Sequence, residues 1–188
     1  GDKLEVRRWW TDCAPEFAAA SRRIRERRPL CHFTTVPYRH QTNGIAERTN
    51  RIVIEGARCL LIQAALPDSW WTVACAFFVA VKNAFYAGED GLTAWERKQE
   101  EKVPFKEYPF GALVFYRPPA GSDKVLDRWA ERLQPAILVS IDLGPCGAWK
   151  RTYGVVKLAK LIGDTRPSRA TIRRSTDVQF PETISFPL

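Results

Sequence analysis

Residues 41–50 read Gln-Thr-Asn-Gly-Ile-Ala-Glu-Arg-Thr-Asn, and this stretch decides how the first half of the chain is interpreted. Its Asn43-Gly44 step is typical of a loop and breaks regular structure. From Ile45 onward, apolar residues recur at three- and four-residue steps, which predicts a long helix that ends at Leu66-Pro67. Glu47 therefore falls in the first turn of this helix.

Upstream of this stretch, the sequence predicts a strand, a helix and a second strand. The aromatic segment 4–11 is typical of a strand, and Asp12 follows directly at its carboxyl end. Pro15 starts a helix over residues 16–28, which carries an alanine-rich face and a cluster of five arginines. Residues 30–36, rich in Thr, Val and Phe, form the second predicted strand. We interpret the arginine cluster as a solvated helix face.

Two more helices are expected downstream of the long helix. Asp68 is the predicted N-cap of an almost wholly apolar helix over residues 69–86, which is expected to be buried together with its Trp70 and Trp71. A short charged helix is predicted over residues 93–102. The residues of the long helix that are predicted to face the core are Ile45, Ile52, Gly56, Leu60 and Ala64.

The pattern changes from helical to alternating after Pro104 and Pro109. Strands are predicted over residues 110–116, 136–143, 153–158 and 177–180. Short strands separated by Gly and Pro turns are typical of a small β-barrel or β-sandwich. We therefore predict an α+β chain with a first domain over residues 1–105 and a small all-β barrel domain over residues 106–188.

The composition indicates a globular intracellular protein. Of the 188 residues, 45% are apolar, which is enough to bury a core, and no uncharged apolar run is long enough to span a membrane. The five cysteines are odd in number and form no Cys-x-x-Cys step, so we interpret them as reduced core thiols. His32 and His40 lack the spacing of zinc ligands with Cys31, so zinc is not expected.

The charge distribution favours a polyanionic partner. The net charge is +8, and residues 1–58 and 109–188 each hold 12 basic against 7 acidic residues, whereas residues 59–108 hold 5 against 7. Basic segments of this kind are typical of proteins that bind nucleic acid. Solubilising surface charge is the alternative, and charge alone does not separate the two.

Two carboxylates have the context of a metal site. Asp12 is expected at a strand end and Glu47 at the start of a long helix, 35 positions later, with one helix and one strand between them. Such an order can bring both side chains to one site. Mg²⁺ prefers oxygen ligands, and paired ions held by carboxylates catalyse in-line phosphoryl transfer.

The residues around both carboxylates strengthen this interpretation. The first acid lies in Thr11-Asp12-Cys13-Ala14-Pro15-Glu16-Phe17, and the second lies in residues 41–50. These stretches are similar to the segments Ser-Asp-Asn-Gly-Gly-Glu-Phe and Gln-x-Asn-Gly-Val-Ala-Glu-Arg-x-Asn of copia-type LTR retrotransposon integrases. Further similar stretches, which extend the resemblance over nearly the whole chain, are Leu66-Pro67-Asp68-Ser69-Trp70-Trp71, Asn83, Phe110-Gly111-Ala112 and Ser175-Thr176-Asp177-Val178-Gln179-Phe180.

The resemblance implies a partial ribonuclease-H-like catalytic core with a helical extension, followed by a small β-barrel. Asp12 and Glu47 correspond to the second and third of the family's three metal-binding acids, and the implied cofactor is Mg²⁺ (or Mn²⁺). Because the chain begins just before the second acid, the first has no counterpart, and we predict that the isolated chain is inactive. Residues considered for DNA contact are Asn43, Arg48, Asn50, Arg51 and Arg58.

Two alternatives remain open for these DNA-contact residues. Arg51 and Arg58 could instead form ion pairs with Glu47 and Glu55 along the helix, an equally good interpretation. Arg48 and Asn50 match the family motif by position, and they either touch DNA or brace the loop. The resemblance does not decide between these roles.

The implied function is DNA integration by strand transfer within a retroelement polyprotein. The expected partners are the element ends and target DNA, the full-length protein is expected to be a nuclear homo-oligomer, and no membrane is involved. The alternative is a non-enzymatic basic nucleic-acid-binding or assembly module left by a decayed element. Cys13-Ala14-Pro15 in place of Asn-Gly-Gly, and His40 where the family has Pro, favour this alternative. The two acids would also suit a different ribonuclease-H-like nuclease, but the Asn-Gly-x-Ala-Glu-Arg motif does not fit that interpretation.

Overall fold

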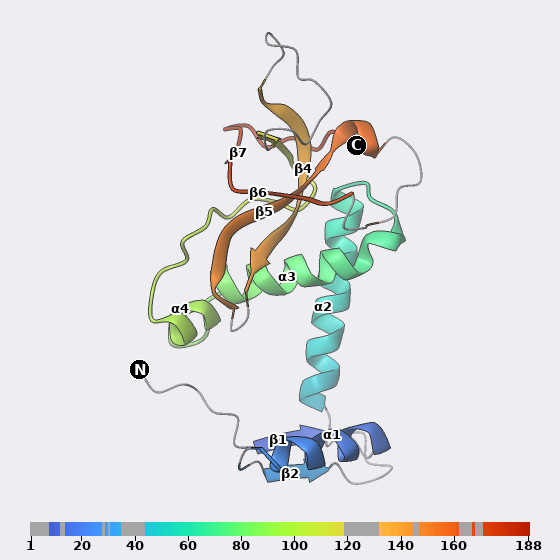
Figure 1. Ribbon diagram of the computed structural model, residues 1–188, viewed down its shortest axis with the longest axis vertical. Helices are drawn as coiled ribbons and strands as arrows, with labels where there is room; N and C mark the ends of the chain where they lie inside the picture. The colour runs from blue at the N-terminus through green and yellow to red at the C-terminus, as the bar shows by residue number, and fades with distance from the viewer. Residues whose placement is uncertain are drawn as a thin grey trace. The chain divides into compact units, whose positions relative to one another are not determined.

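The computed structural model describes residues 8–11, 14–27, 29, 31–34, 44–118, 132–144, 147–161, 167 and 171–188. The chain divides into two compact units, residues 1–52 and 53–188. Helices and strands are mixed in both (Figure 1), which agrees with the predicted α+β class. The predicted domain division at residues 105/106 stays a prediction.

The first unit holds two parallel strands joined by a helix. Strand β1 (Arg8–Thr11) pairs with β2 (Cys31–Thr34), and helix α1 (Pro15–Arg25) connects them. Parallel strands cannot be joined by a tight turn, so a crossover segment such as α1 is required between them. The predicted strand, helix and second strand are therefore confirmed over the described residues, and Pro15 starts the helix as expected.

Helix α2 (Gly44–Gln63) begins one residue before the predicted start at Ile45 and runs across the boundary between the two units. Its predicted core face is wrong in part, because Ile45 and Ile52 are exposed. Toward the carboxyl end, Ala64 is buried as predicted and Gly56 and Leu60 are half-buried. In the second unit, α2 packs closely against the Phe78 ring of the following helix. A Cβ atom added at Gly56 would lie 2.2 Å from that ring. Small side chains at this crossing allow a close approach that large ones would prevent.

A short 3-10 turn, η2 (Asp68–Trp70), leads into helix α3 (Trp71–Phe85). The predicted N-cap at Asp68 is wrong, because the cap position of α3 is Trp70 and makes no side-chain cap hydrogen bond. Trp70 is fully buried as expected, but Trp71 is 59% exposed, which corrects the prediction that both rings are core. Successive residues on a helix point about 100° apart, so adjacent tryptophans do not share one environment.

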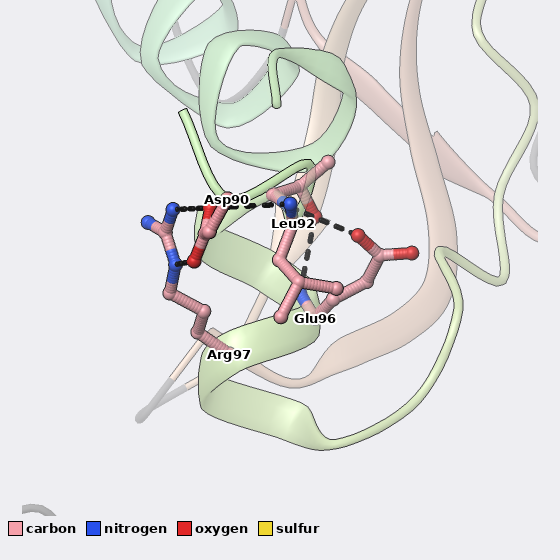
Figure 2. A network of polar contacts seen from close by, with 5 residues as sticks. Asp90, Leu92, Glu96 and Arg97 are labelled. Carbon is pink, nitrogen blue, oxygen red and sulfur yellow. Dashed lines mark hydrogen bonds and ion pairs between the residues drawn. The ribbon is translucent and has the colours of Figure 1, made fainter. Parts of the chain in front are cut away.

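The predicted short charged helix is confirmed as α4 (Ala94–Gln99). Thr93 and Glu96 form a capping box, in which the Thr93 hydroxyl accepts from the Glu96 amide at 3.1 Å and the Glu96 carboxylate accepts from the Thr93 amide at 2.9 Å. Figure 2 shows these contacts beside the Asp90–Arg97 ion pair, which fastens the preceding loop to the helix. These local bonds define both the start and the orientation of α4.

The second unit contains a curled five-stranded antiparallel sheet in the order β6-β5-β4-β3-β7 (Figure 1). Its strands are β3 (Leu113–Tyr116), β4 (Gln134–Leu143), β5 (Trp149–Lys157), β6 (Arg173–Ser175) and β7 (Val178–Gln179), and the 3-10 turn η4 (Leu158–Lys160) follows β5. Four of the strands were predicted. The edge strand β6 was not, because Arg-Arg-Ser carries no apolar alternation.

Helices and sheet of the second unit share one apolar core, in which α3 packs against β4. Its centre is formed by fully buried side chains: Trp70, Phe110, Val114, Ile137, Val139, Val155 and Val156. Gly111, at φ +75°, lies so close to the end of α2 that a Cβ atom added there would lie 2.2 Å from the Cβ atom of Ala64. The Phe110-Gly111-Ala112 step therefore has a packing role in joining α2 to the sheet.

A chain of aromatic contacts closes the sheet on the side of α4. Phe105 meets Trp95 edge-on at 5.3 Å between ring centroids and meets Trp149 at 5.5 Å. Trp149 in turn contacts Tyr153, which contacts Phe180 at 5.1 Å. Burial raises the pKa of Tyr153, whose hydroxyl oxygen accepts a hydrogen bond from a backbone amide at 3.3 Å. Trp149 is thus part of the aromatic packing of the second unit.

The described cysteines correct the prediction of core thiols in two cases. Cys31 and Cys59 are exposed, Cys75 is half-buried, and all three carry free thiols. Cys13 and Cys146 lie outside the described residues. None of the described helices is long and apolar enough to cross a membrane.

Candidate metal and nucleic-acid site

The first candidate acid directly follows strand β1 in the chain. β1 ends at Thr11, which pairs with Thr34 in the parallel register, and Asp12 is the next residue. Asp12 itself lies outside the described residues, so the structure does not test its predicted convergence with Glu47. The local order of strand, acid and helix agrees with the sequence prediction.

A buried polar contact lies at the end of β1. Thr11 is only 7% exposed, and its hydroxyl oxygen lies 2.7 Å from Nε2 of His32 on β2. The Trp9 ring lies 5.4 Å from the His32 ring on one side and contacts Phe17 of α1 edge-on. From the sequence, His32 was considered only as a zinc ligand that lacks partners at the right spacing. Strand alternation, which puts Trp9 and Thr11 on one face of β1, was the signal that could have indicated this contact.

The opposite face of β1 and β2 exposes a pair of aromatic rings. Trp10 is 64% exposed and Phe33 40%, and their rings stack at 4.6 Å with an interplanar angle of 17°. Trp10 and Phe33 are paired in the strand register, so the stack is a cross-strand pair. α1 covers the other face, since its Phe17 contacts Trp9 (Figure 1).

The second candidate acid, Glu47, lies in the first turn of α2 and is exposed. The positive end of the helix dipole favours a carboxylate in this position. Arg48 and Asn50 are exposed beside it, and Asn43 lies outside the described residues. An exposed carboxylate at a helix start has the donor oxygens that Mg²⁺ prefers, and in this respect Glu47 fits the implied ion.

Arg51 and Arg58 lie further along α2, and both are exposed. Within the described part of α2, the predicted alternative of Glu47–Arg51 and Glu55–Arg58 ion pairs is not formed. The two guanidinium groups stand seven positions apart, or about two helical turns, so they follow one side of the helix. Contact of these residues with DNA stays a prediction.

A metal site cannot be assembled from the described side chains alone. Over the described ranges, no three His, Cys, Asp or Glu side chains gather closely enough to hold an ion. The candidate ligand Asp12 lies outside those ranges. The metal assignment therefore rests on residue type and chain order.

Comparison with known proteins supports the retroelement interpretation. No protein-family model matches the chain. The chain is 29% identical over 155 residues to the "Retrovirus-related Pol polyprotein from transposon TNT 1-94" of Nicotiana tabacum. The similarity supports an origin in a retrotransposon polyprotein. It covers 80% of this chain, and the chain spans about a tenth of the length of that relative.

Proposed function

We propose that this chain is part of a copia-type retrotransposon integrase, which joins element ends to target DNA by Mg²⁺-dependent strand transfer. The observation that carries the proposal is the order β1, Asp12, α1, β2 and α2, with Glu47 in the first turn of α2. That order suits two carboxylates meeting at one end of a parallel sheet. The similarity to a retrotransposon polyprotein is the independent support.

A ribonuclease-H-like core is part of the proposal. Parallel sheets are normally covered on both faces, yet β1 and β2 expose the stacked Trp10 and Phe33 on one face. A two-stranded sheet with an open apolar face is also too small to be stable alone. Both features favour a larger sheet to which this unit contributes two strands.

In the proposed reaction, Asp12 and Glu47 bind Mg²⁺ (or Mn²⁺) together with a further acid from another part of the polyprotein. When bound, the ions activate the attacking hydroxyl and stabilise the leaving oxygen. Asn43, Arg48, Asn50, Arg51 and Arg58 bind and orient the DNA backbone. The working enzyme is proposed to be a nuclear homo-oligomer.

A joining assay tests this function. A longer polyprotein segment that includes the upstream acid is expected to join an element-end oligonucleotide to plasmid DNA in Mg²⁺ or Mn²⁺. Asp12→Asn and Glu47→Gln should each abolish the product, because loss of a metal ligand removes the ions on which the chemistry depends. The isolated 188-residue chain should yield none.

The control is Glu55→Gln, which removes an exposed carboxylate from the same helix but outside the proposed site. Product from the isolated chain, or full activity of the Glu47→Gln enzyme, would contradict the proposal. DNA binding without product from the longer protein would instead support the non-enzymatic alternative.

A further inference from the structure

We propose that His32 is a positioning residue, which holds the end of β1 in the place where Asp12 must present its carboxylate to the metal. The inference deepens the proposed function and rests on it. The observation is the 2.7 Å contact between Nε2 of His32 and the hydroxyl of Thr11, the residue directly before Asp12.

The contact ties the carboxyl end of β1 to His32, the second residue of β2. In the strand register His32 is paired with Trp9, and Thr11 is paired with Thr34, so the side-chain bond crosses the ladder diagonally. Thr11↔Thr34 is the last pair of the ladder. A side-chain bond there restrains the strand end from which the chain leaves toward Asp12.

The imidazole is itself held in place by aromatic packing. The Trp9 ring lies against His32 at 5.4 Å with an interplanar angle of 41°, and the Phe17 ring meets Trp9 edge-on at 6.2 Å. The three rings come from β2, β1 and α1. In the chain, β1 precedes Asp12, α1 follows it, and β2 comes after α1. His32 is thus a fixed anchor for the Thr11 hydroxyl.

Such an anchor has a chemical purpose. Metal-binding side chains must be held to within about 0.5 Å of their productive geometry, and the residues that support them tune metal affinity. Thr11 is buried at 7% exposure, so its hydroxyl requires a partner inside the protein. A merely structural hydrogen bond would affect stability, whereas a positioning bond would also affect metal affinity.

The test measures Mn²⁺ affinity of the longer polyprotein segment that includes the upstream acid, by the electron paramagnetic resonance signal of the unbound ion. His32→Ala and Thr11→Val are each expected to weaken binding about tenfold, the usual scale for loss of a residue that supports a metal ligand. His32→Gln should restore affinity to within about twofold, because its amide reaches as far as Nε2 and can donate or accept. His32→Asn is too short to do so.

Thr152→Val is the matched control, because it removes a threonine hydroxyl of the second unit that bonds the Lys150 carbonyl at 3.0 Å. It should leave Mn²⁺ affinity unchanged. Circular dichroism of every variant separates loss of affinity from loss of fold. If His32→Ala does not fold, the comparison of His32→Gln with His32→Asn decides, and equal affinities of these two would overturn the proposal.

Asp12→Asn distinguishes failure of this inference from failure of the proposed function. If Asp12→Asn weakens Mn²⁺ binding while His32→Ala does not, the metal site stands and the positioning role is wrong. If Asp12→Asn binds as tightly as the unaltered chain, Asp12 is not a ligand and both proposals lose their chemistry.

Discussion

At the scale of single residues, two glycines allow backbones to approach in ways that no other residue permits. Gly56 lets the Phe78 ring lie on the backbone of α2, and Gly111 lies against Ala64 with a φ of +75°. A Cβ atom at Gly56 would displace the Phe78 ring, whereas one at Gly111 would also meet the Ala64 backbone at 3.0 Å, which cannot withdraw unless the end of α2 moves. These glycines therefore determine how α2 is joined to α3 and to the sheet.

We expect Gly111→Ala to lower the free energy of unfolding by about 2 to 4 kcal/mol, from the positive φ and the clash with Ala64 together. Gly91→Ala is the matched control, since Gly91 has a φ of +78° but nothing within 4 Å of the added atom. It should lose only about 1 kcal/mol. Urea unfolding of both variants measures the difference, and equal losses would show that the clash is relieved.

At the scale of elements, the loop before α4 is fastened by charge as well as by its capping box. The Arg97 guanidinium, together with the backbone amide of Leu92, lowers the pKa of the Asp90 carboxyl from its usual 3.8 to about 2. The Arg97 Nε–Asp90 Oδ2 distance is 2.9 Å (Figure 2). Because the pair is exposed, its effect should be local to the loop and α4.

This lowered pKa gives α4 a defined dependence on pH. A carboxyl with a lower pKa in the folded protein stabilises it above the unfolded value, near pH 4, and loses that contribution as pH falls toward about 2. Opening of α4, measured as amide hydrogen exchange relative to the intrinsic rate at each pH, should therefore increase between pH 4 and 2, beyond any increase in α3. In Asp90→Asn this extra increase should be absent, and its persistence would assign it to other groups.

At the scale of the whole molecule, the excess of basic residues favours a polyanionic partner. We propose that this partner is nucleic acid. Arg51 and Arg58 of α2 are the most specific candidates for contact with this partner. Both are exposed, and in the described helix they form no ion pair with Glu47 or Glu55. Phosphate contacts of this kind release counterions, so their number can be read from the salt dependence of binding.

The double variant Arg51→Ala, Arg58→Ala should bind duplex DNA more weakly and with a flatter salt dependence. The slope of log K against log salt concentration should fall in magnitude by about 1.8, or about 0.9 for each lost phosphate contact. Lys102→Ala, an exposed cation of the acidic middle segment, should leave the slope unchanged. Fluorescence anisotropy across a salt series measures both, and an unchanged slope in the double variant would remove these arginines from the interface.

Much of the local structure was determined by the sequence itself. Pro15, Gly44 and the Thr93–Glu96 capping box mark helix starts through backbone chemistry that acts within a few residues, and all three were predicted or lie at predicted boundaries. Asp12 and Glu47 were predicted as metal ligands in the same way, from residue type and neighbouring residues, and this stays a prediction.

Only the tertiary structure decided which side chains are buried and which partners they meet. Trp71 and Ile52 are apolar yet exposed, and strand β6 forms from a polar triplet, because burial and edge pairing depend on what another element presents. The Thr11–His32 contact joins residues 21 positions apart and leaves no local pattern in the chain. Local rules act over a few residues, whereas packing depends on contacts between distant ones, and so the Thr11–His32 contact emerged only from the fold.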